Sequence, residues 1–368
     1  MRIAQVVPMY EAVPPKGYGG TERVVSYLTE ELVQRGHDVT LFASADSCTA
    51  ARLIPTVDHA LREHTTAEEI QELAAPLHLA MLSEVFQYAN DFDIMHCHVE
   101  YLSFGFAPFV RTPSVTTLHG RLDFPYLKSV LRRLSDTALI SISHHQRAPL
   151  DEVHPHWVGT VYNAVPVSEF PFSTHAGKYL LFVGRISPEK RVDWAIEIAK
   201  RSGMPLKIVA KIDPCEQDYY ENEIAPLLDH PLIEYVGEAD ERTKRELMQH
   251  AYALVFPINW PEPFGMVMIE AMACGTPVLA LNRGAVPEVL RHGMSGFIGQ
   301  SIEDLVDAVP YVTQMDRRLV RYEAERRFST RAMADNYEQV YRRVIAERQR
   351  DQLAIALGAH PRRVPISA

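Results

Sequence analysis

The sequence predicts an α/β protein made of two doubly wound, Rossmann-like domains. Short apolar runs of strand length alternate with amphipathic stretches of helical period, a pattern typical of parallel sheets covered by helices. The chain has 368 residues, which is enough for two domains of ordinary size. The alternation starts again after Pro166–Pro171. We therefore expect an N-terminal domain over residues 1–168 and a C-terminal domain over residues 169–330.

The composition excludes several classes of protein. A hydrophobic content of 47% with 23% charged residues is that of a folded, soluble protein. The net charge of −10 argues against nucleic acid as the main partner, although it allows a local basic pocket. Four widely spaced cysteines without a C-x-x-C pair indicate reduced thiols in a cytoplasmic protein. No apolar run is long enough to span a bilayer, so we expect no transmembrane segment; peripheral contact with a lipid-borne substrate stays open.

The first elements of the chain predict a parallel β-α-β unit. Ile3–Val7 reads as a buried strand, and a glycine-containing loop follows it. Thr21 is positioned to cap a helix that ends at Gly36, and Val39–Ala43 has the composition of the next strand. Two strands joined through a helix lie parallel, because such a crossover is right-handed. The domain is therefore expected to be doubly wound.

The glycines of the first loop are a candidate binding feature. Gly17, Gly19 and Gly20 differ from a dinucleotide-binding fingerprint, because no third glycine follows at the expected spacing. A nicotinamide cofactor is therefore disfavoured. One interpretation is a plain tight turn. We favour the other, a loop whose bare backbone approaches a ligand, which only glycine allows.

The next region contains a possible metal site. Residues 52–92 have a helical composition, which we expect to be interrupted at Pro76. A short strand follows, and a period of two places His96, His98 and Glu100 on one face of it. Such side chains can ligate a metal. Because Glu100 already lies past the end of the strand, we disfavour that interpretation.

His119 is the main candidate of the N-terminal domain. It follows a strand over Ser114–Leu118 and lies at the carboxyl edge of the sheet, where open α/β sheets bind ligands. The alternative is a histidine at the end of a strand that only hydrogen-bonds its neighbours. A further strand is expected over Thr137–Ser143.

The C-terminal domain opens with a strand over residues 179–184, followed by Arg185. Pro188 is expected to start a helix with Lys190 in its first turn. Both cations then lie at the carboxyl edge of the second sheet, where a helix N-terminus with Arg and Lys suits the oxygens of a diphosphate. The alternative is two ordinary surface cations. Further strands are expected at Leu206–Ala210, Leu232–Val236, Ala253–Phe256 and Val278–Leu281.

Residues 259–280 combine a proline-locked loop, a glycine and a helix start with two carboxylates. Two flanking prolines keep Glu262 on a loop, because proline lacks the amide donor and disfavours helix in the residue before it. The helical pattern starts at Gly265 and places Glu270 one to two turns inside the helix. For an arbitrary glutamate, a solvated helix charge would be the better interpretation. Here the surrounding residues favour a site.

Those residues carry a family resemblance. Glu262-Pro-Phe-Gly-Met-Val-Met-Ile-Glu270, continued by Ala-x-Ala-Cys-Gly-Thr-Pro, resembles the motif of the retaining nucleotide-sugar glycosyltransferases of family four, the glycosyl transferases group 1. The resemblance covers most of the chain. It implies the GT-B fold, in which two Rossmann-like domains face each other across a cleft and a final helix, at about 331–350, packs back on the first domain. It also implies no metal and no cofactor apart from the donor substrate.

The resemblance assigns roles to the candidate residues. Glu270 would accept hydrogen bonds from the ribose diol, and Glu262 would hold a sugar hydroxyl. Arg185 and Lys190 would neutralise the leaving phosphate. His119 would contact the transferred sugar. The other substrate contacts, made mostly by backbone, would come from Gly19, Gly20, Gly237, Glu238, Phe264, Gly265, Met266 and Val267.

Two positions depart from the family pattern. Ala164 stands where relatives have the glycine of an Asn-Gly hinge, and Ala210-Lys211 stands where many have glycines after the strand. Lys211 is either a third phosphate contact or a salt-bridged surface residue. These departures leave the base and the sugar of the donor open.

The predicted function is retaining transfer of a hexose from a nucleoside diphosphate sugar to an acceptor hydroxyl, which forms an α-glycosidic bond. UDP-glucose or a similar donor is favoured, with GDP-mannose as second choice; the acceptor is a sugar, a lipid-linked glycan or a small molecule. We expect a front-side reaction, in which the departing phosphate takes the acceptor's proton, and closure of the domains around residues 163–171. The alternatives are a nucleotide-sugar epimerase on the same fold and a non-catalytic nucleotide-sugar binding protein.

Overall fold

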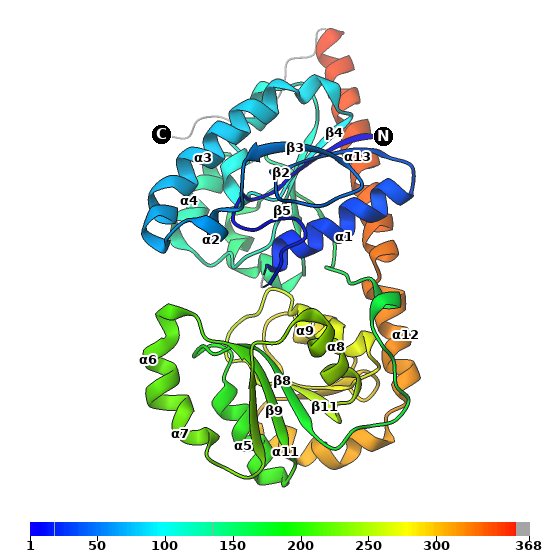
Figure 1. Ribbon diagram of the computed structural model, residues 1–368. Helices are drawn as coiled ribbons and strands as arrows, with labels where there is room; N and C mark the ends of the chain where they lie inside the picture. Colours follow the sequence, from blue (N-terminus) through cyan, green and yellow to red (C-terminus); the bar gives the residue numbers. More distant parts are fainter. Residues whose placement is uncertain (18, 135, 358–368) are drawn as a thin grey trace.

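The computed structural model describes residues 1–17, 19–134 and 136–357, and these residues form two parallel β-sheets, drawn one above the other in Figure 1. The first sheet has the strand order β3-β2-β1-β4-β5-β6-β7, and the second has the order β10-β9-β8-β11-β12-β13. The direction of winding reverses beside β1 in the first sheet and beside β8 in the second. Both sheets are therefore doubly wound, and ligands of such sheets bind near the reversal point, at the carboxyl ends of the strands.

The elements of the first sheet come from the first 160 residues. Its strands are β1 (Arg2–Val6), β2 (Asp38–Ser44), β3 (Arg52–Val57), β4 (Ile94–Cys97), β5 (Ser114–Leu118), β6 (Leu139–Ser141) and β7 (Trp157–Thr160). Its helices are α1 (Gly20–Gln34), α2 (Leu61–His64), α3 (Ala67–Gln87), α4 (Pro125–Arg133) and the 3₁₀ segment η4 (His145–Val153).

The elements of the second sheet follow from residue 180. Its strands are β8 (Leu180–Arg185), β9 (Leu206–Lys211), β10 (Ile233–Gly237), β11 (Ala253–Phe256), β12 (Val278–Leu281) and β13 (Gly296–Gly299). Its helices are α5 (Val192–Ser202), α6 (Gln217–Tyr219), α7 (Ala225–Leu228), α8 (Glu241–Gln249), α9 (Met266–Ala273), α10 (Val286–Val289), α11 (Ile302–Ala308) and α12 (Arg317–Phe328). The chain ends in α13 (Thr330–Ala356).

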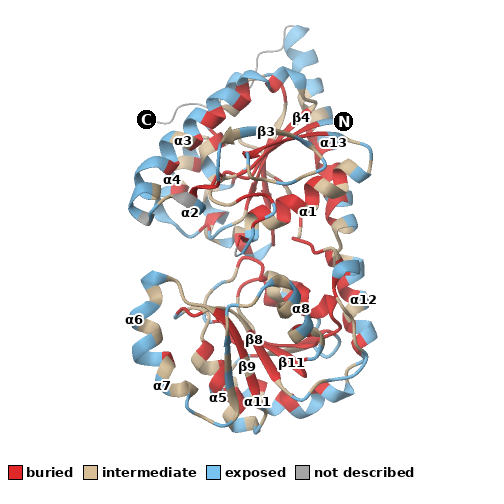
Figure 2. Cartoon of the chain, viewed as in Figure 1, coloured by how far each residue is buried: buried red, intermediate tan, exposed pale blue. Residues whose placement is uncertain are grey.

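The strands lie in the core of each domain. All four residues of β4, β11 and β12 are buried, because helices cover both faces of a parallel sheet. Figure 2 shows the same concentration of buried residues in the strands and on the inner sides of the helices. No helix in the described ranges is both long enough and apolar enough to cross a membrane.

The chain passes between the two sheets twice, and the two passages lie side by side. The first is the segment between β7 and β8, in which the expected boundary at residues 168 and 169 falls. The second is the junction of α12 and α13. The backbone N–H of Val165 donates to the carbonyl of Phe328 at 2.9 Å, and Val165 pairs with Ser329. Tyr337 and Tyr341 of α13 are buried in the core of the first sheet. The C-terminal helix thus packs against the N-terminal domain.

The expectation for residues 52–92 was wrong in two respects. Arg52–Val57 forms β3, an edge strand that contains Pro55. Proline is tolerated in an edge strand, but its presence in a sequence argues against predicting a strand there. Pro76 does not interrupt the following helix, because α3 runs through it from residue 67 to residue 87. Pro76 lies on the exposed side of α3, while Leu82 and Val85 pack into the core.

Candidate active site

A cavity of about 730 Å³ lies between the carboxyl ends of the two sheets. Residues of both sheets line it, so neither domain contains the site alone. Twelve of the thirteen predicted site residues line the cavity; Gly237, which has a φ of 84°, does not. The twelve are Gly19, Gly20, His119, Arg185, Lys190, Glu238, Glu262, Phe264, Gly265, Met266, Val267 and Glu270.

We name the two sides of this cavity by their principal residues. The C-terminal wall is formed by Arg185, Lys190, Lys244, Glu262 and Glu270. The N-terminal wall is formed by Gly19, Gly20, Glu22, His98, Glu100 and His119. The two walls differ in their chemistry.

The loop that carries Glu262 is held by a close backbone contact. Gly284 has a φ of 55°, and a Cβ there would lie 2.3 Å from the backbone N and O of Glu262. The backbone N–H of Ala285 donates to the carbonyl of Glu262 at 2.9 Å. The backbone N–H of Ala285 is therefore already hydrogen-bonded within the protein. Gly265, with a φ of 85°, then turns the chain into α9, where Glu270 is buried but borders the cavity.

Lys190 and Glu262 form an ion pair inside the cavity. Lys190 Nζ lies 2.5 Å from Glu262 Oε2, and the two side chains are only 16% and 12% exposed. The same ammonium lies 5.1 Å from the centroid of the Trp260 ring, a cation–π distance. Because the two charges neutralise each other, an anionic ligand has to compete with Glu262 for Lys190.

Lys190 does not lie in the first turn of a helix, as the sequence had predicted. Its N–H donates to the carbonyl of Ser187 at 3.1 Å and closes a turn. Arg191 follows with a φ of 54°, and α5 begins only at Val192. The left-handed residue redirects the chain, so the cation reaches the cavity from a turn and not from a helix N-terminus.

Arg185 and Lys211 share one carboxylate at the end of the neighbouring strands. Arg185 Nη1 lies 3.2 Å from Asp213 Oδ2, and Lys211 Nζ lies 3.2 Å from Asp213 Oδ1. Arg185 Nη2 also pairs with Glu189 at 3.1 Å. Burial acts to raise the pKa of Asp213, but the hydrogen bonds from the two cations hold it below its ordinary value. Lys211 therefore lines the cavity and is salt-bridged at the same time.

Glu270 is paired with a lysine that the sequence did not identify. Lys244 Nζ lies 3.1 Å from Glu270 Oε2 and 2.9 Å from Glu241 Oε1. Burial opposes the charge of Lys244, yet the two carboxylates raise its pKa. Arg23 of the N-terminal domain reaches Glu241 at 3.4 Å. The sequence did contain a signal for this lysine. Asp240 is a typical N-cap residue and its side chain caps α8, so Glu241 and Lys244 follow directly after the predicted turn at Glu238.

Glu100 supports the predicted histidine on the N-terminal wall. Its Oε1 accepts the backbone N–H groups of His119 at 2.9 Å and of Gly120 at 3.1 Å. Glu100 has a φ of 51°, in the left-handed region that non-glycine residues rarely adopt. Burial raises the pKa of Glu100, and the two amides oppose that rise. The carboxylate fixes the backbone after β5.

His98 and His119 of this wall belong to a hydrogen-bond chain that continues through Gln5 and Tyr341 to His96. His98 Nε2 lies 2.8 Å from Gln5 Oε1, which can only accept, so this nitrogen carries the proton. His98 Nδ1, 2.9 Å from His119 Nε2, must then accept. His96 bonds Tyr341 of α13 at 2.7 Å. No group of three His, Cys, Asp or Glu side chains in the described residues is arranged to hold a metal ion.

Burial keeps these rings neutral. It lowers the pKa of His119 to about 4 and that of His98 well below its ordinary value. The proton on His119 Nε2 is used in the bond to His98, which leaves Nδ1 as a hydrogen-bond acceptor. A hydroxyl that meets this nitrogen in the cavity would donate to it.

Hydrogen bonds join the two domains beside the Glu262 loop. Ser143 Oγ donates to the carbonyl of Pro263 at 2.7 Å. Glu288 of α10 accepts the backbone N–H groups of His144 at 2.8 Å and His145 at 2.6 Å, where η4 begins. The hydroxyl of Tyr162 donates to the same carboxylate at 3.1 Å. A glutamate of one domain thus caps a helical segment of the other.

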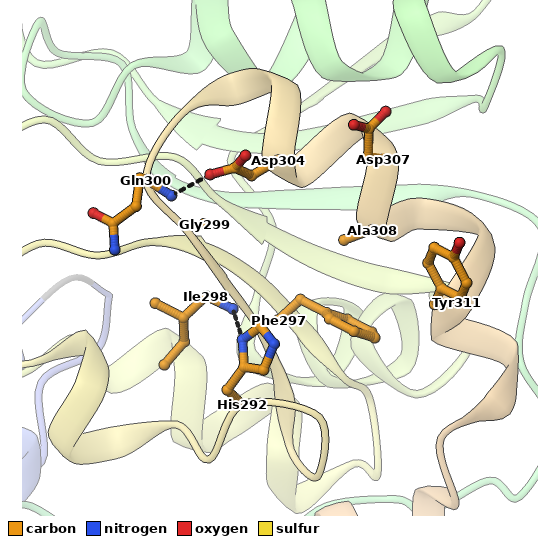
Figure 3. Close-up of a pocket in the computed structure, with 9 residues that line it drawn as sticks. All are labelled: His292, Phe297, Ile298, Gly299, Gln300, Asp304, Asp307, Ala308 and Tyr311. Atoms are coloured by element: carbon orange, nitrogen blue, oxygen red, sulfur yellow. Dashed lines mark hydrogen bonds between the residues drawn. The ribbon is translucent and has the colours of Figure 1, made fainter.

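A smaller cavity of about 340 Å³ lies beside β13 and α11, and none of its lining residues borders the larger one. Figure 3 shows two of its polar groups engaged by the backbone. Asp304 accepts the N–H of Gln300 at 2.7 Å, and His292 Nδ1 accepts that of Ile298 at 3.1 Å. These side chains hold the turn around β13, which is a structural role.

Two family models and several known proteins match the chain. The model "Glycosyltransferase Family 4" matches residues 18–169, and "Glycosyl transferases group 1" matches residues 169–333. A glycogen synthase of Mycobacterium tuberculosis is 25% identical over 93% of this chain and 94% of its own. A phosphatidyl-myo-inositol mannosyltransferase of Mycobacterium leprae is 26% identical over 96% and 100%. Among solved structures, the Anabaena protein HepE in complex with UDP-glucose has a TM-score of 0.68 and 18% identity over 95% of this chain and 100% of its own.

Proposed function

The chain belongs to the group 1 glycosyltransferases of family four and has their GT-B fold, and we propose that it transfers a hexose from a nucleoside diphosphate sugar to an acceptor hydroxyl with retention. UDP-glucose is the favoured donor and GDP-mannose the second. The observation that carries this proposal is the C-terminal wall, where three cations, each held by a carboxylate, border one cavity: Arg185, Lys190 and Lys244.

Paired cations suit a ligand that carries both phosphates and hydroxyls. A diphosphate would exchange places with Glu262 and draw Lys190 onto its oxygens, and Arg185 lies at the same edge. Glu262, released from Lys190, would be free to accept a sugar hydroxyl. Glu270, held by Lys244, would accept the ribose hydroxyls from inside the wall.

The chemistry then needs charge stabilisation at the leaving group. As the bond from the sugar carbon to the phosphate oxygen breaks, negative charge grows on the phosphate, and fixed cations in a water-poor cavity stabilise it most effectively. The backbone N–H groups at the start of α9, from Met266 and Val267, are aimed by the turn at Gly265 and add a helix N-terminus to the same side. We propose that these groups, without a metal, carry the leaving-group charge.

The neutral N-terminal wall suits the sugar. His119 presents Nδ1 as an acceptor to a hydroxyl of the transferred hexose, and its lowered pKa keeps that nitrogen unprotonated at neutral pH. The similar proteins agree with hexose chemistry, because they include a glycogen synthase, a mannosyltransferase and a protein solved in complex with UDP-glucose.

The test is a donor screen followed by product analysis. Thermal shifts with UDP-, GDP- and ADP-sugars identify the donor, and NMR of the product made from an acceptor panel gives the anomeric configuration. We expect an α-linked product from an α-configured donor. A β-linked product would refute retention, and release of an altered sugar nucleotide without any acceptor would favour an epimerase.

A single substitution tests the role of the wall. Arg185→Ala should lower turnover about 100-fold or more, since it removes a cation from the developing charge. Arg201→Ala is the matched control, because Arg201 forms an exposed pair with Glu303 outside the cavity. Full activity of Arg185→Ala would contradict the assignment.

A further inference from the structure

A row of aromatic and cationic side chains leads from the cavity to the surface of the N-terminal domain. It begins at Trp260, which lines the cavity. Arg121 lines the cavity too, and its Cζ lies 5.8 Å from the centroid of the Trp260 ring and 5.4 Å from that of Phe124. The Phe124 ring stacks on Tyr126 with the centroids 5.5 Å apart, and Tyr126 contacts Tyr101 at 6.1 Å. Arg121 thus joins the cavity to three further rings.

The three outer rings come from the ends of two neighbouring strands. Tyr101 lies in the 3₁₀ segment η2 (Glu100–Ser103), which follows β4. Phe124 and Tyr126 lie at the start of α4, which follows β5. Both segments leave the sheet at its carboxyl edge, where ligands of such sheets bind. We name Tyr101, Phe124 and Tyr126 the aromatic platform.

The aromatic platform is exposed although it is largely apolar. Tyr101 is 40%, Phe124 38% and Tyr126 51% exposed. Single exposed aromatic residues need no explanation. In the part of the chain that the structure describes, however, these are the only exposed aromatic rings that contact one another. A contiguous apolar patch that continues a polar cavity is typical of a ligand-binding groove.

The groups along the row suit a carbohydrate. A pyranose ring carries C–H groups on its faces and hydroxyls around its rim, so it can pack on an aromatic ring and hydrogen-bond to polar groups beside it. The polar group here is Arg121, which donates to the two oxygens of Asp123 at 2.8 and 2.6 Å. These hydrogen bonds hold the pKa of Asp123 below its ordinary value. A charged donor and a charged acceptor therefore flank the aromatic platform.

We propose that the aromatic platform binds the second sugar of the acceptor, which makes the acceptor a chain of at least two pyranose sugars. This inference rests on the proposed function and names the acceptor class that it left open. The sugar that receives the hexose lies beside Trp260, whose ring is 5.1 Å from Lys190 Nζ at the proposed leaving phosphate. The next sugar of the chain packs on Phe124 and Tyr126.

A membrane surface is the other ligand that exposed aromatic side chains commonly meet, because Tyr and Trp are enriched at membrane interfaces. Surface attachment of this kind is strengthened by excess positive charge, which attracts anionic lipids. The cation that contacts the aromatic platform, Arg121, is paired with Asp123, and the whole chain has a net charge of −10. The charges therefore favour a neutral sugar chain over a membrane.

The experiment compares acceptors of different length in matched variants of the full chain. The acceptors are the methyl glycoside that the wild type glycosylates best, and the disaccharide and trisaccharide that end in the same sugar. Tyr126→Ala removes the central ring of the aromatic platform. Tyr322→Ala is the control, because Tyr322 is 54% exposed on α12 and does not line the cavity. Kinetics give kcat/KM for each acceptor, and calorimetry gives the affinity for the sugar nucleotide found in the donor screen.

We expect the wild type to use the disaccharide with a kcat/KM about tenfold above that of the methyl glycoside, a gain of the size that one stacked ring can supply. The trisaccharide should add little more. Tyr126→Ala should lose the gain, whereas Tyr126→Phe should keep it because the ring remains. Donor affinity should be equal in all variants, and Tyr322→Ala should match the wild type throughout.

Two results would overturn the inference while leaving the proposed function intact. The wild type could transfer equally well to the methyl glycoside and the longer chains, or only to acceptors that are not sugars. Tyr126→Ala could keep the wild-type preference for the disaccharide. In that case, loss of its binding to vesicles of phosphatidylglycerol and phosphatidylcholine in sedimentation would assign the aromatic platform to a membrane. A wild type that binds no sugar nucleotide, or transfers to no acceptor, would instead refute the proposed function itself.

Discussion

The two walls of the cavity differ in how their side chains are held before a ligand binds. The C-terminal wall consists of charges held in pairs, with Lys190 on Glu262 and Lys244 on Glu270. The N-terminal wall consists of neutral histidines in a hydrogen-bond chain beside Glu100, whose carboxylate accepts two backbone N–H groups. A charged wall binds by exchanging one ion partner for another, whereas a neutral wall binds by offering fixed acceptors. We propose that the phosphates bind to the C-terminal wall and that His119 of the N-terminal wall meets a hydroxyl of the transferred sugar.

The walls also differ in what supports them. The residues that form the C-terminal wall all come from the C-terminal domain, between the end of β8 and α9. The N-terminal wall depends on distant parts of the chain, because Gln5 of β1 and Tyr341 of α13 hold the histidines. Damage at Gln5 or Tyr341 should therefore change the stability of the protein and the geometry of the histidines, although neither residue lines the cavity.

The largest effect is expected from breaking the C-terminal wall at Lys190. Lys190→Ala should lower turnover by about 100- to 1,000-fold, since it removes a cation from the leaving group. It should also destabilise the fold by about 3–5 kcal/mol, because Glu262 is left charged and unpaired in a mostly buried place. Steady-state kinetics and denaturant unfolding measure the two effects.

Two further variants separate these effects. The double variant Lys190→Ala with Glu262→Gln should regain stability and stay inactive. Lys207→Ala is the control, because it breaks an exposed pair with Glu234. Activity that returns together with stability would mean that the pair serves the fold alone.

The second largest effect is expected at Gly284. An added Cβ would lie 2.3 Å from the backbone of Glu262, so Gly284→Ala must move the loop. A displacement of this size can lower turnover about 100-fold without removing any reacting group. Gly293→Ala is a close control, since Gly293 also has a positive φ, of 77°, but nothing within 4 Å of an added Cβ. Equal activity of both variants would show that the loop position is unimportant.

A smaller effect is expected on the N-terminal wall at Tyr341. Tyr341→Phe removes the hydroxyl that bonds His96 and Gln5 and should lower the free energy of unfolding by about 1–3 kcal/mol, because buried partners lose their hydrogen bonds. Turnover should fall less than in Lys190→Ala. Tyr322→Phe, at an exposed position on α12, is the control. If turnover fell as far as in Lys190→Ala, the N-terminal wall would take a direct part in the chemistry.

The smallest effect is a pH dependence of stability from the neutral histidines. The folded pKa of His119, about 4, lies below its ordinary value of 6.5. The unfolded chain therefore binds more protons between these values, and stability is fully present above pH 6.5 and falls as the pH falls toward 4. His119→Gln should flatten this slope in denaturant titrations at several pH values. An unchanged slope would mean that folding does not lower the pKa of His119.

The sequence predicted the C-terminal wall better than the N-terminal wall. The Glu262 loop, Gly265 and Glu270 lie in one short stretch whose prolines and glycine have direct conformational meaning, and the structure brings them into one cavity. Lys190 was expected at the correct sheet edge but on a helix, because nothing in its local pattern reveals that Arg191 adopts a left-handed conformation.

The missed residues share one physical cause. Lys244 and Glu241 lie in the first turn of α8, where charged residues are ordinarily solvated. Their partners include residues distant in the sequence, because Glu270 of α9 pairs with Lys244 and Arg23 of α1 pairs with Glu241. Strand β3 was missed for a different reason, since its proline is allowed only because the strand is at an edge. Information on contacts across the cavity is not present in local patterns.

The central claim, that the C-terminal wall binds a diphosphate, is tested most directly by calorimetry of UDP, GDP and ADP against the matching nucleosides. One of the three diphosphates should bind, its nucleoside should bind at least about tenfold more weakly, which corresponds to about 1.4 kcal/mol, and Arg185→Ala should remove the difference. A nucleoside that binds as tightly as its diphosphate, or a wild type that binds none of the three, would contradict the account.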